Sequence, residues 1–161
     1  MAFSRNFSLE EIGADILHDP FLMPDMSKAV QRILQAQKNG ERVMIFGDYD
    51  VDGISSTAAL FLFLRDELGM DVSYRLPHRV KDGYGMKTYH IEEIAATGAK
   101  LLITVDCGTK DIEPITRAAE LGLDVVVTDH HSCPLVLPEC VAVVNPRRHD
   151  TLYPFSGLSG S

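Results

Sequence analysis

Three short segments of the sequence place carboxylate and imidazole side chains directly after runs of apolar residues. The segments are Asp48–Gly53, Asp106–Gly108 and Thr128–His131, and the apolar runs before them are Val43–Phe46, Leu101–Val105 and Val125–Val127. Short apolar runs of this kind are typical of buried strands in a parallel sheet. Ligands collect at the carboxyl ends of such strands, so we expect the three polar segments to meet at one edge of the sheet.

The three segments contain no lysine or arginine that would neutralise their carboxylates. Clustered carboxylates repel one another, and burying them without a counter-charge is costly. A divalent cation removes that cost, and a mixed set of carboxylate and imidazole ligands suits Mn²⁺, with Mg²⁺ as the second option. An EF-hand calcium loop is disfavoured, because the twelfth position counted from Asp48 is Ala59 and not glutamate.

Taken singly, each segment also has an ordinary structural explanation. Asp106 could cap a helix, the pair His130–His131 could be hydrogen-bonded within a loop, and Asp48–Gly53 could be a solvated acidic turn. Cys107 is interpreted as a small buried thiol, not as a ligand or nucleophile. The equivalent placement of all three segments after three separate strands favours a shared metal site.

A basic segment, Arg75–Lys87, is the candidate phosphate-binding element of this acidic chain. It carries His78, Arg79 and Lys81, and it places Tyr84 between two glycines that allow a ligand to approach closely. Basic residues beside an aromatic ring suit a nucleic-acid backbone with a stacked base. An ordinary basic surface loop is the alternative.

The elements that must position these residues alternate along the chain. Residues 1–40 are expected to form a helical lead-in, with a capping-box pattern at Ser8–Glu11 and a second helix capped by Asp25 and ended near Gly40. Residues 41–155 are expected to form the core. Its predicted strands are Val43–Phe46, Val72–Leu76, Leu101–Val105, Val125–Val127 and Val141–Val144, and its predicted helices are Ser55–Leu68, Thr88–Ala96 and Ile112–Leu121.

Strands separated by helices of this length indicate βαβ units. The near-continuous Val, Ile and Leu content of the strands indicates that both faces of the sheet are covered. The predicted fold class is therefore α/β, with a mostly parallel sheet and helices on both faces.

Length and composition agree with a single folded unit. The chain has 161 residues, and 15 lysines and arginines against 23 aspartates and glutamates give a net charge of −8. Such a chain is not drawn to nucleic acid as a whole, so phosphate binding must be local or metal-mediated. The longest uncharged apolar run, Thr57–Leu64, is far shorter than the ~20 residues of a membrane span. Three cysteines without CxxC spacing suit a reducing cytoplasm.

The ordered set of motifs resembles the DHH phosphoesterase superfamily and, within it, the RecJ-type single-strand DNA exonucleases. Gly47–Ser56 is similar to the first motif, Asp106–Gly108 to the second, and Asp129–His131 to the triplet that names the superfamily. Pro77–Gly85 and the final Gly157–Gly160 also resemble RecJ segments. Phe46 stands where the pyrophosphatase and oligoribonuclease-like branches have histidine, which favours the RecJ branch.

The resemblance implies a metal-dependent phosphodiesterase that degrades single-stranded DNA from the 5′ end in repair or recombination. It implies metal ligands at Asp50, Asp52, Asp106 and His130, with catalytic or supporting roles for Asp48, Asp129 and His131. Together with the positive charge of the basic segment, the resemblance leads us to expect His78, Arg79, Lys81 and Tyr84 to bind substrate phosphate. Two ions, Mn²⁺ or Mg²⁺, are expected in the complete enzyme, and protein partners stay unknown.

Two departures from the family pattern set limits on this expectation. The family has a fourth motif, an aspartate further along the chain, and a second domain called DHHA1, and both are absent from this sequence. We therefore expect the chain to be a truncated DHH domain, the N-terminal part of a catalytic region, and a poor or inactive nuclease by itself. The alternatives are a phosphodiesterase for short oligonucleotides or cyclic dinucleotides, and a non-catalytic module that binds nucleic acid or protein.

Overall fold

The structure, a computed structural model, describes residues 18–160. Five strands of this part form one parallel sheet in the order β2–β1–β3–β4–β5. The strands are β1 (Val43–Gly47), β2 (Val72–Arg75), β3 (Leu101–Val105), β4 (Asp124–Thr128) and β5 (Ala142–Val144). The predicted parallel α/β sheet is confirmed, with strand boundaries within two residues of those expected.

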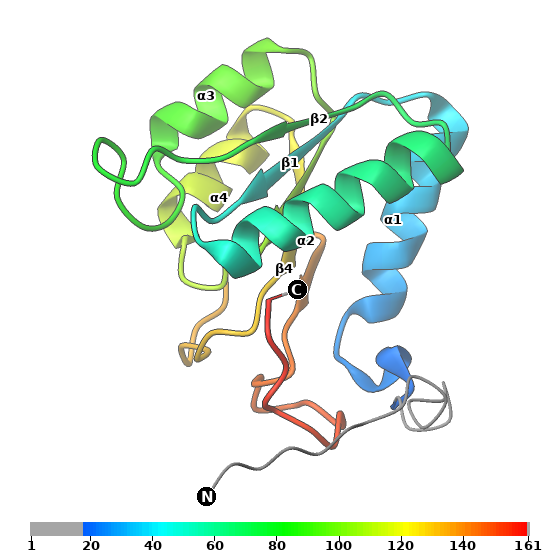
Figure 1. The fold of residues 1–161 in the computed structure, drawn as a ribbon, viewed down its shortest axis with the longest axis vertical. Helices are drawn as coiled ribbons and strands as arrows, with labels where there is room; N and C mark the ends of the chain where they lie inside the picture. The colour runs from blue at the N-terminus through cyan, green and yellow to red at the C-terminus, as the bar shows by residue number, and fades with distance from the viewer. Residues whose placement is uncertain (1–17, 161) are drawn as a thin grey trace, which may run out of the picture.

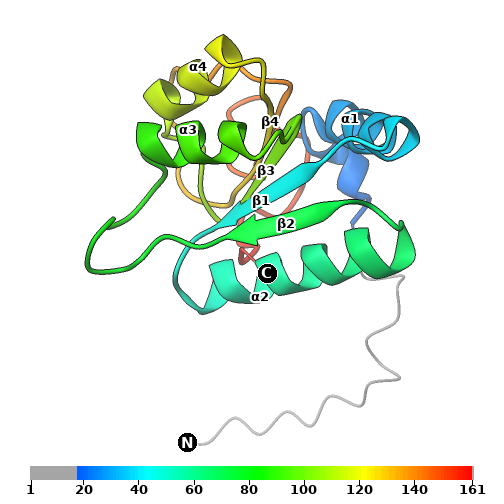
Figure 2. The ribbon, with the colours of Figure 1, turned by 90° about the horizontal axis from the view of Figure 1, so that it is seen from above.

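Helices cover both faces of this sheet, as predicted. They are α1 (Met26–Asn39), α2 (Val51–Leu62), α3 (Thr88–Ala96) and α4 (Ile112–Glu120), with a 3₁₀ turn η2 (Pro20–Leu22) and a π-helical turn η3 (Phe63–Glu67). Figure 1 and Figure 2 show α3 and α4 side by side on one face, while α1 and α2 lie on the other. None of the helices in residues 18–160 is long and apolar enough to cross a membrane.

The core lies in two layers, one on each side of the sheet. Successive side chains of a strand point to opposite faces, so an entirely apolar strand serves both layers. Met44 and Phe46 of β1 pack with the residues of α3 and α4, whereas Val43 and Ile45 pack with those of α1 and η3. All five residues of β1 are buried, which explains the unbroken apolar run in the sequence.

The strand order places a topological switch point between β1 and β3. The chain leaves β1 through α2 for β2 on one side, and then returns through α3 to β3 on the other side. Gly47 pairs with Val105, and Val105 pairs with Thr128, so β1, β3 and β4 end at the same level. A crevice outside the carboxyl ends of the strands is expected at such a point.

One helix start differs from the prediction, and one predicted helix is untested. The helix expected from Ser55 begins at Val51, because the Asp50 carboxylate accepts a hydrogen bond from the Gly53 amide at 3.0 Å and caps it. The helix predicted at Ser8–Glu11 lies outside the described residues.

Asp25 does precede α1, but the prediction that its side chain caps the helix is wrong. The residue has a left-handed backbone with φ 60°, and its carboxylate makes no capping hydrogen bond. It instead pairs with Lys28 at 2.7 Å and with Arg148 at 2.6 Å. Asp25 therefore joins the start of α1 to the chain beyond β5. Burial raises its pKa, but the hydrogen bonds from Lys28 and Arg148 outweigh burial, and the pKa is lowered overall.

We predict that Asp25→Asn lowers the free energy of unfolding at pH 7 by about 1–3 kcal/mol, the range for losing a hydrogen-bonded charge. Asparagine tolerates the left-handed backbone, so the change isolates the charge. Because the folded pKa is depressed, this stability is present above pH 3.8 and is lost as the pH falls through the folded pKa.

Urea unfolding of both proteins between pH 7 and pH 3 measures the difference. Asp66→Asn is the matched control, since Asp66 is exposed and pairs only with its neighbour Arg65 among the described residues. An unchanged difference at pH 3 would contradict the proposed ion pair.

Candidate metal centre

Carboxylates from the ends of β1 and β3 converge at the switch point. One oxygen each of Asp48, Asp50 and Asp106 lies within 4.8 Å of the others. Asp48 and Asp106 are buried, with exposed fractions of 3% and 2%. A second group, formed by Asp106, His130 and His131, has the same spacing and shares Asp106 with the first. Three predicted segments therefore meet at one edge of the sheet.

Close packing of α2 on the end of β1 fixes the first group. A side chain at Gly53 would place its Cβ only 2.4 Å from the backbone oxygen of Asp48, so the first turn of α2 requires glycine there. The Asp48 carboxylate accepts a hydrogen bond from the Tyr49 amide at 2.8 Å. Burial, with the charge of Asp50 close by, raises the pKa of Asp48.

Asp106 is the most constrained residue of the site. Its φ of 61° is in the left-handed region, which is costly for a residue other than glycine. Both carboxylate oxygens are buried, and no described residue gives either of them a well-directed hydrogen bond. His130 Nε2 lies 3.0 Å from Oδ1. Burial and the neighbouring Asp50 raise the pKa of Asp106 to about 6.

Asp129 holds the backbone of both histidines and the ring of His131 in place. Its carboxylate accepts hydrogen bonds from the amides of Thr109, His130 and His131, at 3.0, 2.7 and 3.0 Å. It also lies 2.7 Å from His131 Nδ1. Burial raises the pKa of Asp129, but these hydrogen bonds outweigh burial and the pKa is lowered. These contacts agree with a supporting role, in which an anionic Asp129 leaves the His131 Nε2 available.

Asp52 stands apart from both groups. It lies in the first turn of α2, and its Oδ2 accepts a hydrogen bond from the Gly160 amide at 3.2 Å. Asp48 and His131, expected mainly as supports, lie within the groups instead. Asp50 is the N-cap of α2 and Asp52 is the second residue of the helix, so their side chains point in different directions. The alternation of aspartates in the sequence does not reveal this difference.

Sequence reasoning missed two contributors to the site. The backbone carbonyl of Leu158 lies 2.9 Å from His130 Nδ1. Asn145 is fully buried, and its amide group donates to the Thr109 hydroxyl at 3.1 Å and to the His131 carbonyl at 3.0 Å. Gly157–Gly160 resembles a family segment, but the contact of Leu158 uses a backbone carbonyl, which leaves no signal in side-chain types.

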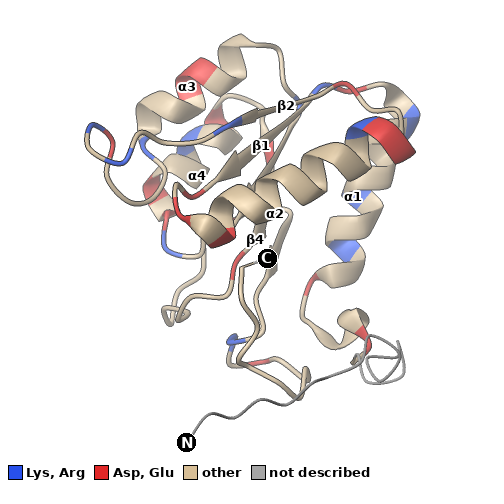
Figure 3. Cartoon of the chain, in the orientation of Figure 1, with Lys and Arg blue, Asp and Glu red and all other residues tan. Residues whose placement is uncertain are grey.

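The basic segment follows β2 and extends beside the acidic site (Figure 3). The Tyr84 hydroxyl lies 3.3 Å from His131 Nδ1, and the Arg79 guanidinium lies 5.4 Å from the centre of the Tyr49 ring. Lys81 is exposed. The Nδ1 atom of His78 accepts hydrogen bonds from the amides of the following residues, so its ring also shapes the loop.

The donor set fits a divalent cation. Ligand atoms within 4.8 Å of one another can converge on a shared ion, because Mg²⁺ binds oxygen at ~2.0–2.1 Å and the larger Ca²⁺ at ~2.3–2.6 Å. Buried Asp106 oxygens without hydrogen-bond donors need a positive partner. Carboxylate with imidazole is a typical set for Mn²⁺.

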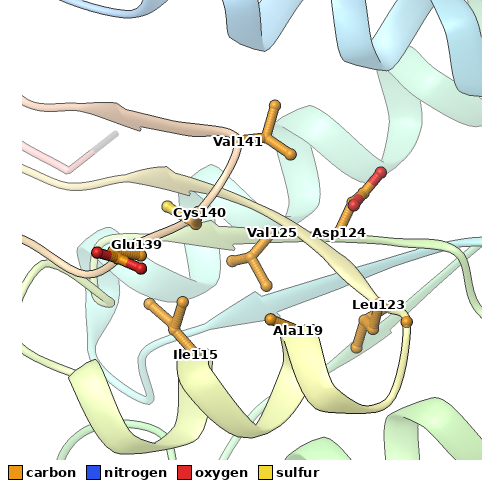
Figure 4. Close-up of a pocket in the computed structure, with 9 residues that line it drawn as sticks. Ile115, Ala119, Leu123, Asp124, Val125, Glu139, Cys140 and Val141 are labelled. Carbon is orange, nitrogen blue, oxygen red and sulfur yellow. The ribbon is translucent and has the colours of Figure 1, made fainter.

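A separate pocket of about 490 Å³ lies at the opposite end of the strands (Figure 4). Ile115 and Ala119 of α4, Val125 of β4 and Cys140 before β5 line it, with Asp124 and Glu139 at its borders. It contains none of the predicted site residues.

Residues 42–159 match the DHH family, N-terminal domain, and the chain belongs to this family. The structure of the site and the order of its motifs agree with that assignment.

Among its relatives, the chain is similar to the single-stranded-DNA-specific exonuclease RecJ. It is 41% identical over 163 residues to RecJ of Bacillus subtilis, covering 97% of this chain and 21% of that protein. It is 36% identical over 135 residues to RecJ of Escherichia coli, covering 84% and 23%. The chain therefore spans about a fifth to a quarter of the length of these relatives.

A solved structure supports the same relationship. The crystal structure of exonuclease RecJ bound to manganese matches with a TM-score of 0.76 and 31% identity, covering 83% of this chain and 34% of that one. The predicted resemblance and fold class are thus confirmed.

We predict that Asp106→Asn abolishes stabilisation by Mn²⁺ without destabilising the metal-free protein. The substitution removes a ligand charge and also relieves repulsion from Asp50, and asparagine tolerates the left-handed backbone. Thermal unfolding with and without Mn²⁺ measures both effects, because a ligand that binds only the folded state raises the Tm.

Asp71→Asn is the control, since Asp71 is exposed and pairs with Arg42 at the amino end of the sheet. An Asp106→Asn protein that Mn²⁺ stabilises as much as the parent would remove Asp106 from the site.

Proposed function

We propose that the chain is the metal-binding part of a 5′→3′ single-stranded-DNA exonuclease that hydrolyses phosphodiester bonds. The convergence of Asp48, Asp50, Asp106 and the two histidines at the β1/β3 switch point supports this proposal most directly. Similarity to proteins named single-stranded-DNA-specific exonuclease supports the substrate class.

The residues that would hold metal are Asp50, Asp106 and His130, with Asp48 and His131 beside them and Asp52 at the border. Two donor groups that share Asp106 would hold two ions. When bound, divalent cations polarise the phosphoryl oxygens and promote ionisation of an attacking water.

The chain's own residues supply orientation and charge. Asp129 holds the His131 ring through Nδ1, and Tyr84 contacts the same atom from the basic segment. The basic segment and the candidate metal centre are therefore connected by a direct contact. Arg79 and Lys81 would bind phosphates of the strand, and Tyr49 and Tyr84 offer rings for bases to stack on.

A chimera tests the proposed activity in the context of a complete enzyme. We would replace the matching segment of Bacillus subtilis RecJ with this chain. The chimera is predicted to degrade single strands in the presence of Mn²⁺ and to release 5′-mononucleotides. Strands labelled at the 3′ end, with the 5′ end free or blocked, report the direction of degradation.

The same chimera with Asp106→Asn is the inactive control. A folded chimera that binds Mn²⁺ but leaves single strands intact would contradict the proposed function. Cleavage of dinucleotides alone would instead assign the short-oligonucleotide activity.

The role of the basic segment is tested by Arg79→Ala in the active chimera. Loss of one phosphate contact is predicted to raise KM for single strands and to reduce the slope of log affinity against log salt by about 0.7. Arg42→Ala is the matched control, because Arg42 lies at the start of β1 and pairs with Asp71 away from the site. Equal salt slopes for Arg79→Ala and the parent would identify the segment as an ordinary surface loop.

A further inference from the structure

The last described residues of the chain return to the candidate metal centre. After β5 the chain turns away from the sheet, and its end then lies beside α2, as Figure 1 and Figure 2 both show. Leu158, Ser159 and Gly160 form a wall of a pocket together with Asp129 and His130. Residues 158–160 have no part in the function proposed above, although the Leu158 carbonyl contacts His130.

The first contact of this segment determines how the His130 ring is protonated. The Leu158 carbonyl oxygen, 2.9 Å from Nδ1, can only accept a hydrogen bond. Nδ1 must therefore carry the hydrogen, and in the neutral ring Nε2 keeps its lone pair. Nε2 is the atom that lies 3.0 Å from the Asp106 carboxylate. The contact thus directs the ligating nitrogen toward the carboxylates.

The second contact concerns Asp52. The Gly160 amide donates a hydrogen bond to its Oδ2 at 3.2 Å. This backbone group therefore touches one predicted ligand, while Leu158 touches another, His130.

The third observation is steric. A Cβ built on Gly160 would lie 2.2 Å from Asp106 Oδ1 and 2.5 Å from its carboxyl carbon. Real Cβ atoms do not approach other atoms so closely. Gly160 does not have a left-handed backbone, so proximity to Asp106, not backbone conformation, is what requires glycine here.

The segment is tied to the loop that carries the histidines. Arg147 donates to the Ser156 carbonyl at 3.1 Å, and its own amide donates to the side-chain oxygen of Asn145 at 2.8 Å. Asn145 in turn donates to the His131 carbonyl. Arg147 and Asn145 therefore link the chain at Ser156, two residues before Leu158, to the loop of the histidines.

We infer that residues 158–160 are a positioning segment for the metal ligands. The Leu158 carbonyl sets the His130 tautomer, the Gly160 amide orients Asp52, and the missing side chain at Gly160 leaves room for the Asp106 carboxylate. This inference rests on the proposed metal-dependent function and extends it from side chains to backbone groups.

The test compares the parent chain with Gly160→Ala. Nitrogen-15 NMR of the histidine rings reports the position of the ring hydrogen without metal, and calorimetry with Mn²⁺ reports metal affinity. The parent is expected to carry the His130 hydrogen on Nδ1. Gly160→Ala is expected to lose this preference and to bind Mn²⁺ about 10–100-fold more weakly, the range for losing a partner of a metal ligand.

Gly98→Ala is the control for general destabilisation. Gly98 has a left-handed backbone, with φ +83°, so alanine strains it, but nothing lies within 4 Å of its Cβ position and it follows α3 away from the site. This variant is expected to keep the parent's Mn²⁺ affinity and His130 tautomer.

The outcomes separate this inference from the proposed function. Unchanged tautomer and affinity in Gly160→Ala would overturn the positioning role while the metal site stands. A parent chain that binds no Mn²⁺ would overturn the proposed function, and the NMR result would still decide the contact with Leu158. If Gly160→Ala does not fold, a parent His130 with its hydrogen on Nε2 overturns the inference, and one with it on Nδ1 supports it.

Discussion

Repulsion between clustered carboxylates, two of them buried, is the constraint on which this structure depends. Asp48, Asp50 and Asp106 are brought together at one point of the sheet, and burial together with the charge of Asp50 raises the pKa values of Asp48 and Asp106. The rest of the fold outweighs that cost through two buried layers of apolar side chains. A cation at this point would turn the least favourable part of the fold into a source of stability.

The fold could be predicted from the sequence because most of the strands are largely apolar and the helix ends are marked by glycine or a polar residue. Convergence of the three polar segments followed from one rule about parallel sheets. The place of Asp52 could not be predicted in this way. It depends on where α2 begins, and the capping contact of Asp50 moves that start four residues ahead of the expected Ser55.

Contacts made by the backbone were also beyond prediction. The Leu158 carbonyl and the Gly160 amide are backbone groups of a kind that almost every residue has, so the residue types in the sequence do not predict these two contacts. Only the glycine left a trace in the sequence, and its reason, a carboxylate 54 positions earlier in the chain, is visible only in three dimensions. Asp25 shows the reverse case, in which a typical capping residue forms a long-range ion pair instead.

Because β1, β3 and β4 end at the same level, the positions at which this chain can accept an inserted or deleted residue are restricted. Gly47, Val105 and Thr128 lie in register, so one extra residue in any of these strands would move the next carboxylate by about 3.3 Å and turn it to the other face. The amino ends of the same strands carry exposed ion pairs such as Arg42 with Asp71. Insertions and deletions are therefore tolerable at the amino ends of the sheet and excluded at its carboxyl ends.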